Sequence, residues 1–434
     1  MIVISITWLV HKYMKSGLKI GLMALLILTA TYVALGAASP GQNNESFSLN
    51  IFGNANMDNT IDEQDVSYLE EVIGKTKAAT NLSDANLDGS IDDKDVELVK
   101  EIIKGDEREI SVIDEIGKTV NIKEPLNRIV VCHAMFAEVM KSLGADDKIV
   151  GIPTYMENYT TFYPVLSKLA TVGGASTPDT EAIVSLKPDL VIVYGNWAAN
   201  LETDLKSVAP VLRLTYRPFS TTDQDIMMLG YIVGKNEEAS QLIDFYQKPL
   251  MLIKERVSSL AEDKKPRVYL EYSDYRTNSE GSGTHEMLLM AGGRNIASGI
   301  DTDPNGVPFI DPEWVVKENP EIIMRRALKA DASCGYDEDN TTQMKALREK
   351  ILNRPELANI TAVKDGRVYC FSSDISTGLS YWLGIVYMAK ILHPDIFADL
   401  DPVAIHQEYL TRFQRLDFNL DEHGVFFYPM KDAS

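Results

Sequence analysis

Oxygen-bearing side chains recur at a fixed spacing in two stretches, which read NANMDNTIDEQD at 54–65 (the first loop) and DANLDGSIDDKD at 84–95 (the second loop). Hard oxygens on alternate residues, closed by a carboxylate at position twelve, supply the ligand shell that Ca²⁺ requires. The spacing therefore predicts two calcium sites. The candidate ligands are Asn54, Asn56, Asp58, Thr60, Asp62 and Asp65 in the first loop, and Asp84, Asn86, Asp88, Ser90, Asp92 and Asp95 in the second.

Three positions of each loop refine this prediction. Position seven, Thr60 or Ser90, would contribute its backbone carbonyl. Position six requires a left-handed backbone, which Gly89 adopts freely and Asn59 tolerates. Asn54 opens the first loop where the second has an aspartate, so we expect the first site to bind calcium more weakly.

Two acidic turns without an ion are the alternative interpretation. Residues 51–105 carry 13 acidic and 5 basic side chains, so the carboxylates in excess repel one another unless cations bind. Repetition in register favours calcium, because each loop also has an isoleucine at position eight (Ile61, Ile91) that could pair the loops, and a short apolar-faced helix after it. A segment this short builds little core, so we expect the ion to supply part of its folding free energy.

This pair of loops resembles a dockerin module, in which aspartate closes the loop and no helix precedes it. The resemblance covers residues 51–105 and implies a small α-helical domain that binds a cohesin domain on another protein. The usual recognition positions, ten and eleven, read Glu63-Gln64 and Asp93-Lys94. They depart from the common Ser/Thr pairs, which leaves the identity of the cohesin partner open.

The first forty residues have the pattern of an export signal. Basic residues precede the apolar run IGLMALLILTATYVALGAA, which ends in small residues before Ser39-Pro40. A retained membrane anchor is the alternative, because the run approaches spanning length. Either way we expect an extracytoplasmic protein, at the cell surface or associated with the membrane. Residues 41–50 are expected to form a polar linker.

The composition excludes several classes of protein. The chain has 434 residues and 42 basic against 63 acidic side chains, a net charge of −21, which argues against a nucleic-acid binder. Three cysteines without a CxxC pair predict neither a disulfide framework nor a zinc site. Six histidines without HxxxH or HExxH spacing disfavour a metal centre built from histidine.

From Ile110 onward, short β-rich runs alternate with amphipathic helices, which predicts an α/β fold with parallel sheets. The run VIDEIGKTVNI predicts a hairpin, and RIVVC, KIVGIPT, DLVIV and PVLRL predict buried strands. We expect an N-lobe at 109–221, a long connecting helix at 222–262 interrupted near Gly234, and a C-lobe with C-terminal helices at 263–434. Two such Rossmann-like lobes leave a cleft, with ligands at the carboxyl ends of strands.

A second resemblance covers roughly residues 109–420. IDEIGKTVNIKEPLNRIVV, LGADDKIVGIP and TPDTEAIVSLKPDLVIV are similar to the N-lobe of the substrate-binding proteins for iron–siderophore, haem and cobalamin importers. PEWVVKENPEIIM and GRVYCF are similar to their C-lobe. The resemblance implies a rigid two-lobe protein that delivers a bulky metal chelate to the membrane subunits of an ABC importer and catalyses no reaction.

The predicted strand ends place polar and aromatic side chains together. Aromatic faces suit flat macrocycles and catecholates, and arginines suit carboxylate or phosphate groups on a ligand. For His133, a buried imidazole without ligand contact is the alternative interpretation. The resemblance implies that Tyr155 and Tyr194 are aromatic cleft positions. The candidate ligand-binding residues are His133, Tyr155, Tyr194, Trp197, Tyr216, Arg217, Tyr272, Arg276, Arg325, Arg326, Ser373 and Asp374.

Glu181 and Glu313 precede the similar segments AIVSLKPD and WVVKENPE. The resemblance implies that one such carboxylate per lobe pairs with arginines of the importer. The alternative is a pair of acidic residues favoured by the helix dipole.

Four functions remain open from the sequence. The first is a solute-binding protein for a ferric siderophore, haem or corrinoid, with a calcium-binding dockerin-like module. The second is a dockerin-bearing extracellular enzyme that acts on polysaccharide, although no carboxylate pair, GxSxG elbow or P-loop is found. A structural surface module with a vestigial cleft is the third. Direct binding of Zn²⁺ or Mn²⁺ is the fourth, which the few histidines disfavour. The ligand itself is not identified; Arg217, Arg325 and Arg326 favour an anionic chelate.

Overall fold

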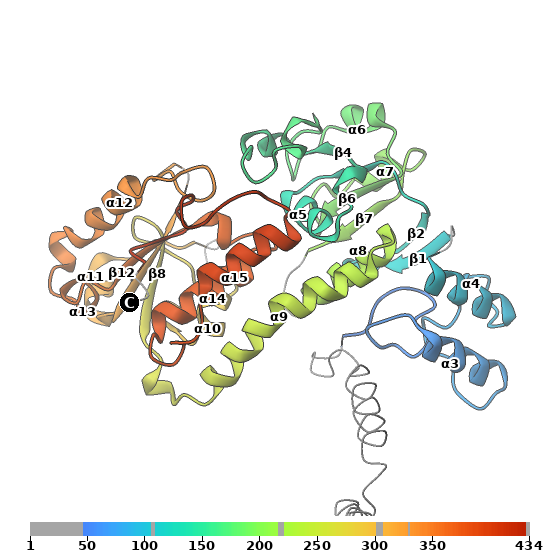
Figure 1. Ribbon diagram of the computed structural model, residues 1–434, viewed down its shortest axis with the longest axis horizontal. Helices are drawn as coiled ribbons and strands as arrows, with labels where there is room; N and C mark the ends of the chain where they lie inside the picture. Colours follow the sequence, from blue (N-terminus) through green and yellow to red (C-terminus); the bar gives the residue numbers. More distant parts are fainter. Residues whose placement is uncertain (1–46, 106–108, 216–220, 301–306, 329, 431–434) are drawn as a thin grey trace, which may run out of the picture. The chain divides into compact units, whose positions relative to one another are not determined.

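The computed structural model describes residues 47–105, 109–215, 221–300, 307–328 and 330–430 (Figure 1). The expected export signal lies outside the described residues, as do Tyr216 and Arg217.

The two acidic loops each lead into a helix, α3 (Glu63–Ile73) and α4 (Asp93–Lys104), and these two helices pack on each other. Both helices begin with the same reciprocal cap. The N-cap carboxylate, Asp62 or Asp92, accepts a hydrogen bond from the backbone of the helix, and the aspartate three residues later accepts one from the N-cap backbone. The sequence repeat is therefore a structural repeat.

A hairpin follows the repeat, as the sequence predicts, with β1 (Glu109–Ile113) antiparallel to β2 (Thr119–Lys123). The residues just before the first loop add to this hairpin, because Ile51 forms an antiparallel bridge with Val112. The part of the expected linker that the structure describes, from Phe47, therefore belongs to the folded chain, and residues from Phe47 onward form one unit.

The N-lobe is built on a five-stranded, fully parallel sheet in the order β5-β4-β3-β6-β7. Its strands are nearly continuous apolar runs, as expected for a sheet covered on both faces. The elements of this lobe are β3 (Ile129–Val131), α5 (Ala134–Leu143), η1 (Asp146–Lys148), β4 (Ile149–Ile152), η2 (Thr154–Asn158), η3 (Leu166–Lys168), β5 (Ala170–Thr171), α6 (Thr180–Leu186), β6 (Leu190–Tyr194), α7 (Leu201–Asp204) and β7 (Val211–Leu214).

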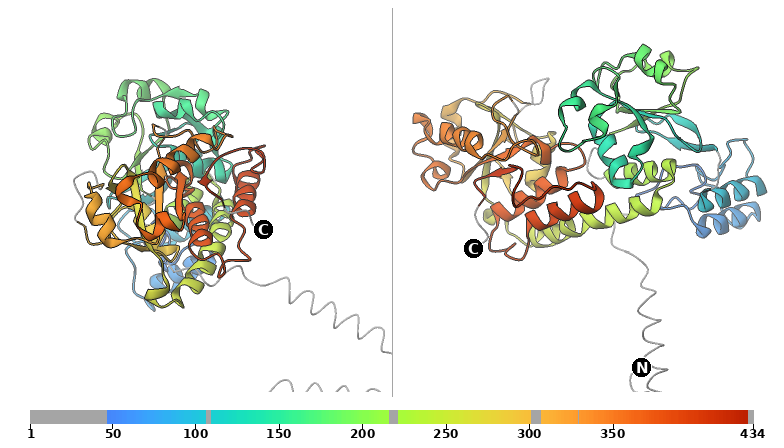
Figure 2. Two further views of the ribbon diagram at one scale, coloured as in Figure 1. Left: turned by 90° about the vertical axis from the view of Figure 1, so that its left-hand side faces the viewer. Right: turned by 45° about the horizontal axis from the view of Figure 1, so that its top comes forward.

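Two helices occupy the expected connecting segment, α8 (Thr222–Val233) and α9 (Asn236–Ser258), separated by Gly234 in the left-handed conformation. α9 has 23 residues and so extends about 35 Å at 1.5 Å per residue. α9 packs against its neighbour α8, against α5 of the N-lobe and against α14 of the C-lobe. It runs beside α14 in Figures 1 and 2.

The C-lobe sheet has the order β10-β8-β11-β12-β13, in which β13 and the extra strand β9 pair antiparallel with their neighbours and the rest are parallel. Its strands are β8 (Arg267–Ser273), β9 (Arg276–Thr277), β10 (Arg294–Asn295), β11 (Ile322–Ala327), β12 (Val368–Ser372) and β13 (Phe427–Tyr428). The remaining elements are η5 (Glu262–Lys264), α10 (Gly283–Met290), α11 (Pro312–Glu318), α12 (Thr342–Leu352), η6 (Pro355–Leu357), α13 (Thr361–Lys364), η7 (Ser373–Ile375), α14 (Tyr381–Leu392), α15 (Pro402–Glu408) and the π-helical turn η8 (Tyr409–Phe413).

Strand order reverses at one point in each sheet. The chain leaves β3 for β4 on one side and returns to β6 on the other; in the C-lobe the reversal lies between β8 and β11. Loops diverge at such points, so ligands bind outside the carboxyl ends of these strands. The predicted α/β fold with parallel sheets is confirmed.

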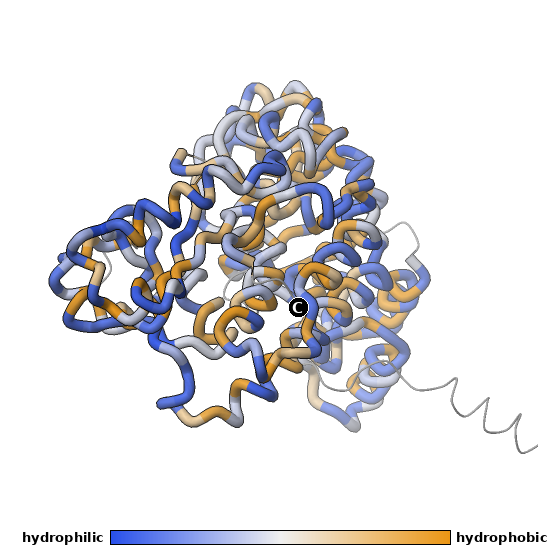
Figure 3. Tube along the Cα trace, turned by 60° about the vertical axis from the view of Figure 1, so that its left-hand side comes forward, coloured by the Kyte–Doolittle hydropathy of each residue, from blue (hydrophilic) through white to orange (hydrophobic). Residues whose placement is uncertain are grey.

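Apolar and polar stretches alternate along the chain (Figure 3), which matches elements that bury one face. Among the described residues, no helix is both long and apolar enough to cross a membrane.

Candidate functional site

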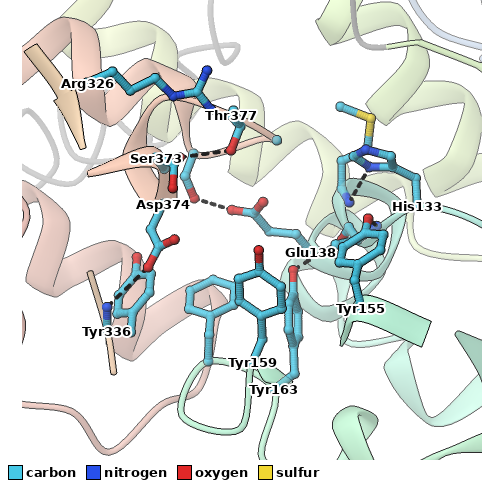
Figure 4. Close-up of a pocket in the computed structure, with 15 residues that line it drawn as sticks. His133, Glu138, Tyr155, Tyr159, Tyr163, Arg326, Tyr336, Ser373, Asp374 and Thr377 are labelled. Carbon is cyan, nitrogen blue, oxygen red and sulfur yellow. Dashed lines mark hydrogen bonds between the residues drawn. The ribbon is translucent and has the colours of Figure 1, made fainter. Parts of the chain in front are cut away.

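A cavity of about 290 Å³ is lined by residues from both lobes (Figure 4). On the N-lobe side are His133, Tyr155 and the aromatic segment that contains Tyr159 and Tyr163. On the C-lobe side are Arg326 at the end of β11 and the residues that follow β12. The cavity therefore lies at the carboxyl ends of β3 and β4 in the N-lobe and of β11 and β12 in the C-lobe, the edge at which such sheets bind ligands.

His133 and Tyr155 together cap the start of α5. His133 Nδ1 accepts a hydrogen bond from Met135 N at 3.2 Å, and the Tyr155 hydroxyl accepts one from Ala134 N at 2.8 Å. Since Nδ1 accepts, the proton of the neutral imidazole lies on Nε2, which can donate. Burial lowers the pKa of His133 to about 4 and raises the pKa of Tyr155 to about 12. At neutral pH both groups are uncharged, and both can donate a hydrogen bond to a ligand.

Lys141 fixes the aromatic segment on the same side of the cavity. Its ammonium donates to the carbonyl of Phe162 at 2.6 Å and lies 5.1 Å from the ring centroid of Phe162. The Tyr163 hydroxyl donates to the Ala134 carbonyl at 3.1 Å. Burial lowers the pKa of Lys141 to about 8. These contacts attach the segment to α5, so its tyrosines are positioned before a ligand arrives.

Glu138 joins the two lobes at the wall of the cavity. It belongs to α5, yet its carboxylate accepts hydrogen bonds from Leu379 N at 3.1 Å, from the Tyr409 hydroxyl at 2.8 Å and from the Ser380 hydroxyl, all in the C-lobe. Burial raises the pKa of Glu138 to about 7. A Cβ on Gly378 would lie 2.9 Å from Glu138 Oε2, so this approach requires glycine at 378.

Asp374 is the fixed carboxylate on the C-lobe side. It follows β12, where it accepts a hydrogen bond from Tyr336 N at 3.2 Å. A Cβ on Gly335 would lie 1.8 Å from Asp374 Oδ2, so the backbone at 335 packs directly on this carboxylate. Arg326 lines the same side, and its guanidinium lies 5.6 Å from the ring centroid of Tyr272.

The expected pair of arginines at the end of β11 does not face the cavity together. Arg325 is 1% exposed, and its guanidinium is held by Asp331 at 2.7 Å and by Glu271 at 3.6 Å. Successive residues of a strand point to opposite faces of the sheet, so only Arg326 reaches the cavity. Arg325 does not line the cavity, and its terminal nitrogens bond to Asp331 and to two backbone carbonyls of the C-lobe, so the structure does not support its predicted role as a ligand contact.

Other predicted contacts lie beside the cavity or away from it. Tyr194 and Trp197 pack on His133, with ring centroids 5.6 Å and 6.0 Å from the imidazole. The ring of Tyr272 does not line the cavity but lies against the guanidinium of Arg326, which does. Arg276 donates to the Val307 carbonyl at 2.9 Å and does not line the cavity. The predicted residues that do line it are His133, Tyr155, Arg326, Ser373 and Asp374.

The sequence reasoning missed several residues that line the cavity or, like Lys141, support its wall. Glu138 and Lys141 stand three apart in the otherwise apolar helix AMFAEVMKSL, and such charges inside an apolar helix signal buried partners. The aromatic run around Phe162 follows a predicted strand directly, which was a second available signal. Tyr336 and Ser380 carry no signal of this kind, because tertiary packing alone brings them to the site.

The two acidic loops have nearly identical internal geometry. Position five donates its backbone N–H to the amide oxygen at position three, at 2.9 Å in the first loop and 2.8 Å in the second. The position-twelve carboxylate, Asp65 or Asp95, accepts from two backbone regions of its own loop. Burial, together with the charges of Asp58 and Asp62, raises the pKa of Asp65 to about 6.

The oxygen atoms at position one are suited to a cation. Asn54 donates from Nδ2 to the carbonyls of Leu49 and Asp58, which fixes the identity of its amide nitrogen and leaves Oδ1 buried without a hydrogen-bond partner. Asp84 Oδ1, at the same position of the second loop, is likewise buried and unpartnered. Buried oxygens without donors, in a ring of further oxygens, fit a hard cation such as Ca²⁺.

Side chains other than carboxylates must complete such a site. In the described part of the chain, no three or more His, Cys, Asp and Glu residues converge as a metal-binding group. The loops would therefore use asparagine and main-chain oxygens beside their carboxylates. In the second loop, Lys94 Nζ lies 3.0 Å from Asp88 Oδ2 and competes with an ion for that carboxylate.

The two predicted docking glutamates occupy equivalent places. Glu181 and Glu313 are exposed, and each stands in the first turn of a seven-residue helix, α6 or α11. The backbone N–H of each glutamate donates to Oδ1 of the aspartate two residues earlier, at 3.0 Å for Glu181 and 2.8 Å for Glu313. Each lobe thus presents one exposed carboxylate at a helix start, and docking remains a prediction.

Comparison with known proteins identifies related chains. Residues 129–374 match the family described as periplasmic binding protein. The molybdate-binding protein MolA of Haemophilus influenzae is 24% identical over 342 residues, which cover 71% of this chain and 92% of that protein. The Fe(3+)-citrate-binding protein YfmC of Bacillus subtilis is 25% identical over 293 residues, covering 63% and 82%.

Solved structures share the fold. MolA bound to molybdate superposes with a TM-score of 0.60 at 23% identity, over 71% of this chain and 99% of that chain. FepB from Veillonella parvula, described as a TroA-like periplasmic binding protein, superposes with a TM-score of 0.61 at 22% identity, over 74% and 99%. The family match begins after the loops at 54–65 and 84–95, so it does not bear on them.

Proposed function

Because the chain belongs to the periplasmic binding protein family, we propose that it is the extracytoplasmic receptor of an ABC importer for a metal-containing solute. The observation that carries the proposal is the cavity formed by both lobes, in which Arg326 and Asp374 face His133 and Tyr155. Preformed donors on two rigid lobes bind a solute without reacting with it.

A compact metal complex fits the cavity better than a large macrocycle. Its volume of about 290 Å³ is at the lower end of small-molecule pockets, which span about 300–1,000 Å³. Among the chelates that the sequence suggested, we therefore favour a small ferric complex over haem or a corrinoid. The relatives named for molybdate and for Fe(3+)-citrate support a compact, anionic, metal-containing ligand.

The donors of the cavity agree with such a ligand. Arg326 is the cationic group that supports an anion, and the hydroxyls of Tyr155 and Tyr159 and the imidazole of His133 are uncharged donors around it. The relatives are named as binding proteins, which favours this function over a polysaccharide hydrolase.

Two further parts of the chain have proposed roles. The acidic loops bind two Ca²⁺ ions and, by their resemblance to a dockerin, present a surface for a cohesin domain. The unpartnered oxygens of Asn54 and Asp84 support the calcium sites. Glu181 and Glu313 dock the two lobes on the membrane subunits of the importer, supported by their exposure at equivalent helix starts.

Titration of the exported chain with a ligand panel tests the proposed function. Trp197 lies beside His133, so its fluorescence should respond to ferric citrate, a ferric siderophore or molybdate. We expect saturable quenching by one of these compounds, none with Trp197→Phe, and recovery of the compound unchanged. Haem and cobalamin serve as bulky competitors. Quenching by none of the five compounds, or chemical turnover, would refute the proposal.

A further inference from the structure

The first loop is held by a residue far away in the sequence. Tyr231 on α8 is 4% exposed, and its hydroxyl reaches the backbone of the first loop. Ile61 N donates to the Tyr231 hydroxyl at 2.8 Å, and Thr60 Oγ1 lies 3.1 Å from the same oxygen. The hydroxyl also approaches the Ile61 carbonyl at 3.3 Å. A side chain on α8, outside the acidic-loop segment, thus forms hydrogen bonds with positions seven and eight of the first loop.

The atoms that Tyr231 holds belong to a predicted ligand. The Ile61 N–H and the Thr60 carbonyl are parts of one planar peptide unit. Fixing the N–H therefore fixes the direction of the Thr60 carbonyl, which is the expected calcium ligand at position seven. Tyr231 also contacts the backbone of Ile61, at position eight of the loop.

Position one of the first loop is fixed from the other side. Asn54 Nδ2 donates to the Leu49 carbonyl at 2.8 Å and to the Asp58 carbonyl at 2.7 Å. The residues next to Leu49 join the hairpin, since Ile113 N donates to the Asn50 carbonyl at 2.9 Å. Positions one and seven of the first loop are thus both held by structure outside the loop.

The second loop has a different environment in the described chain. Gly89 and Ser90 are exposed, whereas their counterparts Asn59 and Thr60 are half-buried. Ile91 is half-buried, whereas Ile61 is 4% exposed. The second loop thus has a carboxylate at position one, Asp84, and is exposed to solvent around position seven. The first loop has an amide at position one, Asn54, and is bound by Tyr231.

We propose that Tyr231 is a positioning residue for the first calcium site. Calcium in this site then stabilises α8 and, through α8, the N-lobe. This inference rests on the proposed calcium sites. Preorganisation of the Thr60 carbonyl offsets the charge that Asn54 lacks, because less order must be imposed when the ion binds. α8 packs on α9 and on α5, which carries the wall of the cavity, so the ion is coupled to the folding of that lobe.

Calorimetric titration of the full chain with Ca²⁺ tests the assignment. Asp88→Ala disables the second loop at a partly exposed position and isolates the first site. In this background Tyr231→Phe keeps the ring and removes the hydroxyl, which leaves the Ile61 N–H unpaired. We expect calcium affinity to fall about tenfold, as for a lost buried hydrogen bond. The rise in melting temperature on adding calcium should shrink as well.

Tyr68→Phe is the matched control, because the Tyr68 hydroxyl donates to the Ala78 carbonyl at 3.1 Å at an exposed place in the same segment. It should leave calcium affinity unchanged. Thr60→Val, which removes only the side-chain contact, should weaken binding less than Tyr231→Phe and serves if the latter fails to fold. Equal affinity in the parent, Tyr231→Phe and Thr60→Val would overturn the inference. Absence of calcium binding by the unmodified chain would instead refute the calcium sites themselves.

Discussion

The acidic-loop segment and the solute cavity are built in opposite ways. All side-chain ligands proposed for one loop fall within twelve residues, so local sequence places them. The cavity wall combines His133 and Glu138 from one lobe with Arg326 and Ser380 from the other, some 240 residues apart for the bonded pair Glu138 and Ser380. The comparison teaches that a motif can predict a local site, whereas a cleft depends on packing between distant elements.

Removal of calcium should have the largest effect on stability. It distinguishes the two regions, because the ions bind in the acidic loops and not in the cavity. A site occupied at 100 times its dissociation constant stabilises the fold by about 2.7 kcal/mol, so two sites contribute about 5 kcal/mol. Chelator should therefore lower the melting temperature of the full chain by several degrees. Scanning calorimetry with and without chelator measures the shift. An unchanged melting curve would show that no ion stabilises the loops.

Arg326→Gln should have the next largest effect, and only on the cavity. A hydrogen bond to a charged group contributes about 1.5–3 kcal/mol, so we expect ligand affinity to fall about 10- to 100-fold. Arg276→Gln is the control, because Arg276 does not line the cavity. Calcium binding should stay unchanged in both variants. Equal loss of affinity in both would place the anion elsewhere.

Glu138→Gln should change the pH dependence of stability by a smaller amount. The folded pKa of Glu138 is raised to about 7 from 4.5, so between these values the folded state binds more protons than the unfolded state. This group therefore makes stability fall as pH rises from 4.5 to 7. His133, with its pKa lowered to about 4, acts in the opposite sense between 4 and 6.5.

Glutamine does not titrate. It keeps one acceptor oxygen for the hydroxyls of Ser380 and Tyr409 and loses the bond from Leu379 N, a loss that does not depend on pH. Denaturant melts at pH 5 and pH 7 should therefore show a relative gain in stability for Glu138→Gln at pH 7. Glu157→Gln, at an exposed position of the same lobe, is the control. The same pH slope in the parent and in Glu138→Gln would mean that Glu138 does not titrate in this range.

Charge reversal of Glu181 and Glu313 should have the smallest effect on the purified protein. Both side chains are exposed, so stability should change by less than about 0.5 kcal/mol, and ligand affinity should be unaffected. Uptake through the importer should nevertheless be lost, because the predicted contact with the membrane subunits is reversed. Normal uptake by the double variant would contradict the docking role.

The sequence predicted the elements better than the contacts. The hairpin, the alternation of strands and helices and the interruption at Gly234 are all present, because hydrophobic period and turn residues act locally. Arg325 shows where adjacency misled, since neighbouring residues of a strand face opposite sides. Tyr231 lies 170 residues from Ile61 and could not be linked to it without the fold.

Native mass spectrometry of the exported chain tests the central claim most directly. We predict one small metal-containing molecule per chain, released intact on denaturation, together with two calcium ions. Arg326→Gln should lose the small molecule and keep the calcium. A chain that carries no such molecule when supplied with ferric citrate, a ferric siderophore and molybdate, or that releases an altered one, would contradict a receptor that binds its solute unchanged.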